Sequence, residues 1–162
     1  MGDGYMYHCE KCGKSYSVFP GMGMLYPQVC EDVLSAVRAG EYGQKLKEAA
    51  ESERYVGVAA ENKVYRCECC GNWEVLPDAS VFGLADKEKG QKIRFGGKTI
   101  AEWGEIPYVD GKKDYRLIEE YVPTCEKCGG DMHAKKLTKR LRLACHDCGT
   151  PLTQDPDAIC WD

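Results

Sequence analysis

Two stretches in the first third of the chain have the hydrophobic spacing of amphipathic helices. Apolar side chains recur every three or four residues from Val29 to Val37, after Pro27, which suits a first helical turn, and before Gly40, which suits a stop. A second stretch, from about Gln44 to Glu53, places leucine and alanine opposite a charged face. We predict a helical hairpin that covers a sheet formed by the strands before and after it in the chain, whereas exposed apolar residues would indicate an arm that docks on a partner. The residues that decide this are Tyr26, Val33 and Tyr42.

Alternation with period two predicts short strands elsewhere. Four of them flank two cysteine-containing turns, at residues 5–8, 15–19, 64–66 and 73–76. Between residues 132 and 143, apolar residues interleaved with lysine and arginine predict the two strands of a hairpin.

The stretch from residue 77 to residue 122 has a weaker pattern. We predict short strands at 93–95 and 98–100, on either side of a glycine pair, and an irregular turn at 101–103. Residues 106–109 and 115–122, joined by an Asp-Gly turn, predict a hairpin whose second strand leads directly to Cys125.

The predicted strands lead into four Cys-x-x-Cys-Gly turns, which we call knuckles. Two residues between the cysteines let one tight turn aim both sulfurs at a single point, and the glycine permits backbone conformations that other residues resist. Four sulfurs from two knuckles can surround a tetrahedral ion. The eight candidate metal ligands are Cys9, Cys12, Cys67, Cys70, Cys125, Cys128, Cys145 and Cys148.

Four knuckles allow three pairings into two sites. Sequential pairing joins Cys9/Cys12 to Cys67/Cys70 and Cys125/Cys128 to Cys145/Cys148, and it closes the shorter loops. Nested pairing joins the first knuckle to the last and the second to the third. Closing its longer loop costs roughly 1–2 kcal/mol more in conformational entropy. The matched flanking strands of the first two knuckles also favour the sequential pairing, which is our prediction.

The segment from about residue 122 to residue 152, with two knuckles and an alternating stretch between them, resembles the zinc ribbon. The resemblance implies a short antiparallel sheet around one zinc ion, and no single activity. Paired knuckles also resemble those of rubredoxin, an electron carrier with one iron held by four cysteines. Rubredoxin-like chains are shorter and pack aromatic residues around the iron, whereas lysines and arginines surround the turn at 125–149 here. We therefore expect Zn²⁺, two ions per chain.

These patterns predict an α+β protein with two zinc-ribbon-like antiparallel β modules. The first module would span residues 1–121, split by the helical insertion and extended by a β-rich segment. The second would span residues 122–162. No Ser/Gly-rich or Pro-rich tract separates them, so we expect no flexible linker.

Composition adds the expected setting. Eleven cysteines in 162 residues, without a basic segment and apolar run near the beginning, favour reduced, metal-bound thiols in a cytoplasm rather than disulfides. No apolar stretch is long enough to cross a bilayer, so we expect no membrane partner. The three remaining cysteines, Cys30, Cys69 and Cys160, show no low-pKa setting or adjacent base, which favours packing over catalysis.

The expected function is that of a non-enzymatic binding or adaptor protein with structural zinc. Residues 124–148 carry a net charge of +3 in a chain whose net charge is −4. Solvated strand edges are the favoured explanation of these charges, and the functional hypothesis is an anionic partner, either nucleic acid or an acidic protein surface. The alternative functions are an iron-binding electron carrier and an enzyme with a cleft between the modules. The candidate binding patch is Lys135, Lys136, Lys139, Arg140 and Arg142.

Overall fold

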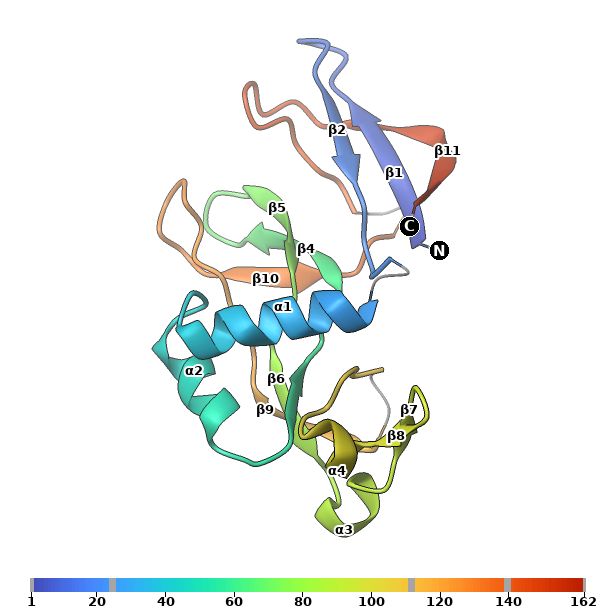
Figure 1. Ribbon diagram of the computed structural model, residues 1–162. Coiled ribbons are helices and arrows are strands. Elements are labelled where there is room, and N and C mark those ends of the chain that lie inside the picture. The colour runs from blue at the N-terminus through green and yellow to red at the C-terminus, as the bar shows by residue number, and fades with distance from the viewer. Residues whose placement is uncertain (1, 24–25, 111–112, 139–140, 162) are drawn as a thin grey trace. The chain divides into compact units, whose positions relative to one another are not determined.

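The computed structural model describes residues 2–23, 26–110, 113–138 and 141–161, and it confirms the predicted α+β class. Within these residues, short helices accompany four small antiparallel sheets (Figure 1). The chain divides into two compact units. Unit 1 comprises residues 1–24, 61–76 and 122–162, and unit 2 comprises residues 25–60 and 77–121. No helix among the described residues is long and apolar enough to span a membrane.

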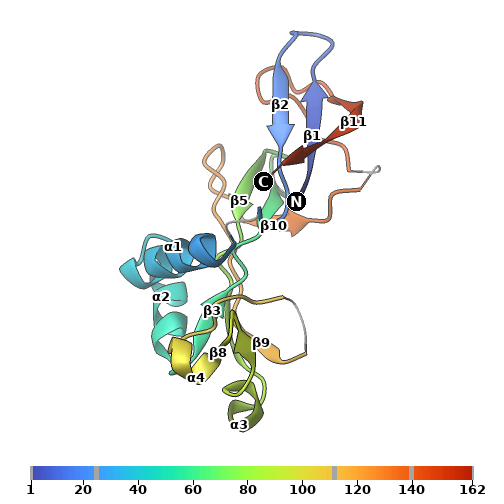
Figure 2. The same cartoon turned by 45° about the vertical axis from the view of Figure 1, so that its right-hand side comes forward.

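Unit 1 contains two three-stranded sheets. The first has the order β11-β1-β2 and is formed by β1 (Gly2–His8), β2 (Ser15–Val18) and β11 (Thr153–Trp161), as Figure 2 also shows. The second has the order β10-β4-β5 and is formed by β4 (Asn62–Cys67), β5 (Trp73–Pro77) and β10 (Met132–Lys135). The predicted strands around the first two knuckles are confirmed. Strand β11 was not predicted, although it pairs with β1 over most of its length.

The predicted hairpin between residues 132 and 143 does not form. Strand β10 pairs instead with β4, with Met132 opposite Cys67 and Lys135 opposite Val64. Residues 137–138 and 141–143 are not in a strand, and Leu143 accepts a backbone hydrogen bond from Leu152. The alternating pattern correctly indicated a half-buried strand, but period two carries no information on the partner strand.

The compact units differ from the predicted division at residue 121. Segments from both ends and from the middle of the chain build unit 1, and residues 25–60 and 77–121 form the other unit. The reason lies in the pairings of β1 with β11 and of β4 with β10, which join residues far apart in sequence. The core of unit 1 is formed across these segments by Tyr7, Val18, Val64, Trp73 and Leu143.

Unit 2 packs two helices against a three-stranded sheet. The helices are α1 (Tyr26–Ala39) and α2 (Gln44–Glu51), and the sheet has the order β3-β6-β9, formed by β3 (Val56–Val58), β6 (Val81–Leu84) and β9 (Tyr115–Glu119). Helix α1 contacts β3, and α2 contacts β6 and β9. The predicted helical hairpin is thus confirmed. The sheet that it covers is that of unit 2, rather than a ribbon sheet.

The apolar face of the hairpin is buried. Val33 is 7% exposed, and the Tyr42 ring packs edge-on against Tyr121 at 5.2 Å between ring centroids. Both observations favour a covering role over a docking arm. The side chain of Tyr26 lies outside the described part of the chain.

The rest of unit 2 corrects two local predictions. Residues 100–103, of which 101–103 were predicted as an irregular turn, form the helical turn α4 (Ile100–Trp103), because Thr99 and Glu102 make a capping box. Residues 106–109 are not a strand, and β9 pairs with β6. Gly111 of the predicted turn lies outside the described residues. The predicted strand pair around the two glycines is confirmed as β7 (Arg94–Phe95) and β8 (Lys98–Thr99), and α3 (Lys87–Gly90) precedes it.

Two buried polar side chains fix the start of β6. The Ser80 hydroxyl donates to Asp78 Oδ1 at 2.5 Å, and the Ser80 amide donates to the same oxygen at 3.0 Å. The Tyr121 amide in turn donates to Ser80 Oγ at 2.9 Å. Because these groups satisfy one another, their burial is compatible with a stable core.

Candidate metal centres

The four knuckles share one backbone pattern. In each, the amide of the glycine donates to the carbonyl of the first cysteine, and the amide of that cysteine donates to a carbonyl five residues later. The glycine has a positive φ in every knuckle, between 69° and 75°, which is strained for other residues. The first cysteine of each knuckle is buried and the second is more exposed. The local sequence therefore determines the shape of each knuckle.

The structure brings all eight predicted cysteines together in two clusters of four, both within unit 1. The inner cluster consists of Cys67, Cys70, Cys125 and Cys128. The outer cluster consists of Cys9, Cys12, Cys145 and Cys148.

The predicted sequential pairing is therefore wrong, and the pairing is nested. The entropy that favours sequential pairing amounts to roughly 1–2 kcal/mol, which a few strand contacts outweigh. Pairing of β4 with β10 aligns Cys67 with Met132, four residues after Cys128. Pairing of β1 with β11 places the first knuckle beside the last in the same way, with His8 opposite Thr153.

The sulfur positions suit a tetrahedral ion. Sγ of Cys67 lies 3.4 Å from Sγ of Cys128, and Cys70 lies 3.6 Å from Cys125. In the outer cluster the corresponding distances are 3.5 Å and 3.6 Å, and within each cluster all ligand atoms lie within 4.8 Å of one another. Four sulfurs bound to zinc at about 2.3 Å lie about 3.8 Å apart. Each cluster could therefore hold a metal ion after small adjustments.

Hydrogen bonds favour the thiolate at one buried cysteine of each cluster. The Tyr16 hydroxyl and the backbone amide of Cys148 lower the pKa of Cys145 to about 6. The backbone amide of Cys70 is the main cause that lowers the pKa of Cys67 to about 7. A lowered pKa favours the thiolate at both sulfurs, and the thiolate is the form that binds a metal.

One exposed cysteine of each cluster, Cys128 or Cys12, has a raised pKa instead. The backbone amide of Gly130 favours the thiolate of Cys128, but the neighbouring thiols of Cys70 and Cys67 raise its pKa to about 12. At Cys12 the backbone amide of Lys14 likewise favours the thiolate, but the neighbouring thiols outweigh this effect and raise the pKa to about 12. Four adjacent thiols do not all ionise by themselves, because like charges repel, and a bound metal cation would offset that repulsion.

Aromatic residues surround the outer cluster. The Tyr16 hydroxyl is 3.1 Å from Cys145 Sγ and accepts the backbone amide of His146 at 3.2 Å. The Trp73 ring lies 4.6 Å from the His146 ring and 5.8 Å from the Tyr16 ring, measured between centroids. We expected lysines and arginines around the turn at 125–149, whereas the structure also places Tyr16 and Trp73 beside the Cys145/Cys148 knuckle.

The inner cluster has a different setting. A Cβ atom placed on Gly130 would lie 3.2 Å from the Cys69 Cβ and 3.4 Å from Cys67 Sγ, so the backbone approaches the cluster closely here. Cys69 is exposed and is not one of the four clustered sulfurs. Nearby, Lys135 Nζ lies 3.1 Å from the Glu68 carboxylate and lowers its pKa.

Sequence reasoning did not identify Tyr16, Trp73 and Gly130 as parts of these centres. Tyr16 and Trp73 lie on the strands that leave their knuckles, four residues after Cys12 and three after Cys70. An aromatic residue at that position is a signal that could have been used. Their contacts with the last knuckle depend on the nested pairing, which the sequence pattern alone does not reveal.

The other candidate residues have varied settings. Cys30 is 4% exposed and packs as a small apolar residue, as predicted. His8 Nδ1 lies 2.8 Å from Asp155 Oδ1. In the predicted binding patch, Lys136 and Arg142 are exposed and Lys135 contacts Glu68. Lys139, Arg140 and the side chain of Cys160 lie outside the described residues.

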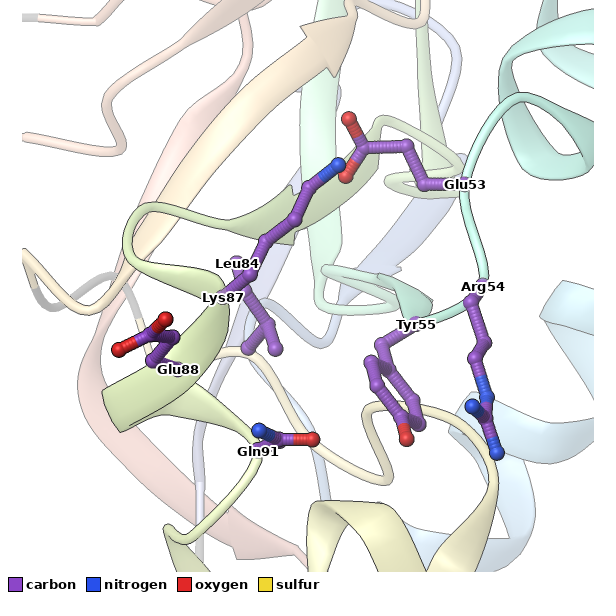
Figure 3. Close-up of a pocket in the computed structure, with 7 residues that line it drawn as sticks. All are labelled: Glu53, Arg54, Tyr55, Leu84, Lys87, Glu88 and Gln91. Carbon is purple, nitrogen blue, oxygen red and sulfur yellow. The ribbon is translucent and has the colours of Figure 1, made fainter.

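Two cavities give further places for a ligand. A groove of about 380 Å³ in unit 1 is lined by residues of β4 and β10 and of the adjoining segments, including Glu61, Lys63, Lys135 and Lys136. A pocket of about 190 Å³ in unit 2 has Leu84 and Tyr55 in its wall, with Lys87 extending toward the Glu53 carboxylate (Figure 3). Arg116 binds that carboxylate and Arg54 stacks on Tyr55, so these charged groups already have partners.

Comparison with protein-family models, with curated proteins and with solved structures finds no match to this chain.

Proposed function

We propose that this chain is a non-enzymatic binding or adaptor protein in which two Zn²⁺ ions hold unit 1 together. The observation that carries the proposal is the pair of four-cysteine clusters. Four protein sulfurs complete a tetrahedral shell, which leaves no position for water or substrate and is typical of a structural site. The role of the metal is then to fix the surface that unit 1 presents.

Iron is the second candidate metal, and a specific observation favours testing it. The outer cluster has three aromatic neighbours, Tyr16, Trp73 and His146. Aromatic residues also pack around the iron of rubredoxin-like chains, so this observation strengthens the resemblance to rubredoxin. Elemental analysis and the absorption spectrum of the protein purified from its native host distinguish the two. We expect a colourless protein with two zinc ions per chain, whereas a red protein that contains iron would favour electron transfer.

The proposed binding surface is the basic segment from residue 135 to residue 142. Lys136 and Arg142 are exposed, and the groove along β4 and β10 is lined by Lys63 and Lys135, one from each strand, and by Glu61. Such a surface complements an anionic partner, either the backbone of a nucleic acid or an acidic protein. Both strands that line the groove adjoin inner-cluster knuckles, so the groove depends on that cluster.

The test replaces Lys139, Arg140 and Arg142 by glutamine and measures binding to random-sequence nucleic acid over a range of salt concentrations. Contact with phosphates predicts weaker binding and a flatter salt dependence, with zinc content unchanged. The matched control removes the same charge from unit 2, through glutamine at the exposed Lys45, Lys92 and Lys113. If the unmodified protein binds no nucleic acid even at low salt, the acidic protein partner remains, and a pull-down from the native host identifies it.

A further inference from the structure

The nested order places the inner cluster inside the loop that the outer cluster closes. Cys12 and Cys145 are 133 residues apart, whereas Cys70 and Cys125 are 55 apart. By loop-closure entropy alone, the inner site closes about fourfold more readily. Once the inner site is closed, the loop that the outer site must close consists of the segments 12–67 and 128–145, about 72 residues in total. This shorter loop favours closure of the outer site by about 2.5-fold.

Direct contacts also join the two clusters, and we expect them to contribute more to the coupling than the loop-closure entropy does. Trp73 follows the inner knuckle Cys67/Cys70 and is 4% exposed. Its indole Nε1–H donates to the carbonyl of Ala144 at 2.8 Å, immediately before Cys145 of the outer cluster. The strand that leaves the inner cluster therefore holds a knuckle of the outer cluster in place.

A second contact completes the connection. Tyr16, which follows the outer knuckle Cys9/Cys12, packs against the Trp73 ring and has its hydroxyl 3.1 Å from Cys145 Sγ. Trp73 and Leu143 also belong to one buried core with Tyr7 and Val18. Side chains that follow a knuckle of each cluster therefore pack against one another in one core.

We propose that the two clusters bind metal cooperatively, with occupation of the inner cluster strengthening binding at the outer cluster and the reverse. The inference rests on the proposed metal-binding function and adds that unit 1 responds to metal as one switch. Couplings between sites are typically 5- to 150-fold, so the loop term of about 2.5-fold is too small alone. The Trp73 contact must supply most of the coupling.

The experiment titrates the reduced, metal-free full chain with Zn²⁺ and counts ions per chain by native mass spectrometry. Two independent sites of equal affinity give about half of the chains singly loaded at one equivalent, and independent sites of unequal affinity give more. Cooperative binding predicts clearly less than half. A singly loaded fraction of half or more, together with an outer-site affinity that does not change when the inner site is removed, would overturn the proposal.

Two sets of variants test whether the Trp73 contact carries the coupling between the clusters. Trp73→Phe keeps an aromatic ring but removes the indole donor, so the singly loaded fraction should rise while saturation stays at two ions. Trp103→Phe is the matched control, because it removes an indole bond of the same kind, to the Phe95 carbonyl at 2.9 Å in unit 2. An unchanged singly loaded fraction in Trp73→Phe would overturn the assigned route.

The variant with serine at Cys125 and Cys128 removes the inner site without altering Trp73. Its outer site should bind Zn²⁺ at least about fivefold more weakly than the outer site of the unmodified chain. Equal affinity would contradict the coupling. If the unmodified chain binds no metal, the proposed function itself fails, whereas two independent ions would refute the coupling alone.

Discussion

A single hydroxyl outside the knuckles shapes the chemistry of the outer cluster. The Tyr16 side chain is the first cause of the lowered pKa of Cys145, and its oxygen also accepts the His146 amide. In zinc proteins, groups that hydrogen-bond the ligands set ligand orientation and metal affinity. Tyr16 is therefore a positioning residue of this site rather than a ligand.

The variant Tyr16→Phe should weaken metal binding at the outer cluster by about 10-fold while leaving the inner ligands in place. The measurement is the Zn²⁺ affinity of each site in competition with a chelator. The matched control is Tyr7→Phe, because the Tyr7 hydroxyl donates to Gln154 at 3.3 Å rather than to a sulfur. An outer-site affinity equal in both variants would show that the hydroxyl of Tyr16 has no special role.

At the scale of single residues, the sequence predicts features that neighbouring residues determine and misses contacts between residues far apart in the chain. The eight clustered cysteines could be predicted, because two residues and a glycine define each knuckle within five positions. The environment of Cys145 could not, because Tyr16 lies 129 residues away and reaches it only through the nested arrangement. Close packing at Gly130 was missed for the same reason, since it involves Cys69 from another segment.

Among the elements, β3 lies very close to the segment around Ile106. A Cβ atom on Gly57 would lie 2.6 Å from the Ile106 carbonyl oxygen and 2.8 Å from its Cβ. On the neighbouring strand, a Cβ atom on Gly83 would lie 2.7 Å from the Glu53 carboxylate, the flexible end of a side chain. Backbone resists displacement more than the end of a side chain does, so we expect alanine to be tolerated less well at Gly57 than at Gly83.

Gly57→Ala should therefore destabilise unit 2 by about 1–3 kcal/mol through overpacking. Gly83→Ala, its control, should cost less, because Glu53 can rotate away. Urea denaturation followed by amide exchange in β3 and β6 measures both. A larger loss for Gly83→Ala than for Gly57→Ala would contradict this interpretation of the packing.

The helices were easier to predict than the strand partners. The apolar spacing from Val29 to Val37 and the turn at Gly40 are contained within one element, and α1 ends at Ala39. Pairing of β10 with β4 has no such local signal, because any alternating strand fits any other with a suitable face. Strands β3 and β6 were missed because nearly all of their residues are buried, so apolar and polar positions do not alternate along them.

For the whole molecule, the clusters belong to one unit only. Unit 1 contains both clusters, and the sheet of unit 2 packs on α1 and α2 with its own apolar core. If metal binding is coupled to the folding of unit 1, the two units should respond differently when metal is removed.

A strong chelator should accordingly abolish amide protection in β4 and β10 and preserve it in β3 and β6. Hydrogen exchange read by mass spectrometry, on the reduced full chain, resolves these segments. Restoration of protection by added Zn²⁺ is the control for irreversible damage. Protection that persists in β4 and β10 after verified metal removal would show that the clusters are dispensable for folding.

The sequential pairing illustrates how far loop lengths can guide a prediction for a whole chain. The entropy argument ranked the pairings by roughly 1–2 kcal/mol, and that margin is comparable with a few cross-strand side-chain pairs. The sheets β11-β1-β2 and β10-β4-β5 supply such contacts between distant segments. Information on those contacts is spread over the chain and is absent from the spacing of the cysteines.

The nested pairing is the central claim, and the metal content of two four-serine variants tests it most directly. The first variant replaces the outer set, Cys9, Cys12, Cys145 and Cys148, and the second replaces Cys9, Cys12, Cys67 and Cys70. Nested pairing predicts one ion per chain in the first variant, because the inner cluster stays complete, and none in the second. No ion in the first variant together with one in the second would contradict it and establish sequential pairing.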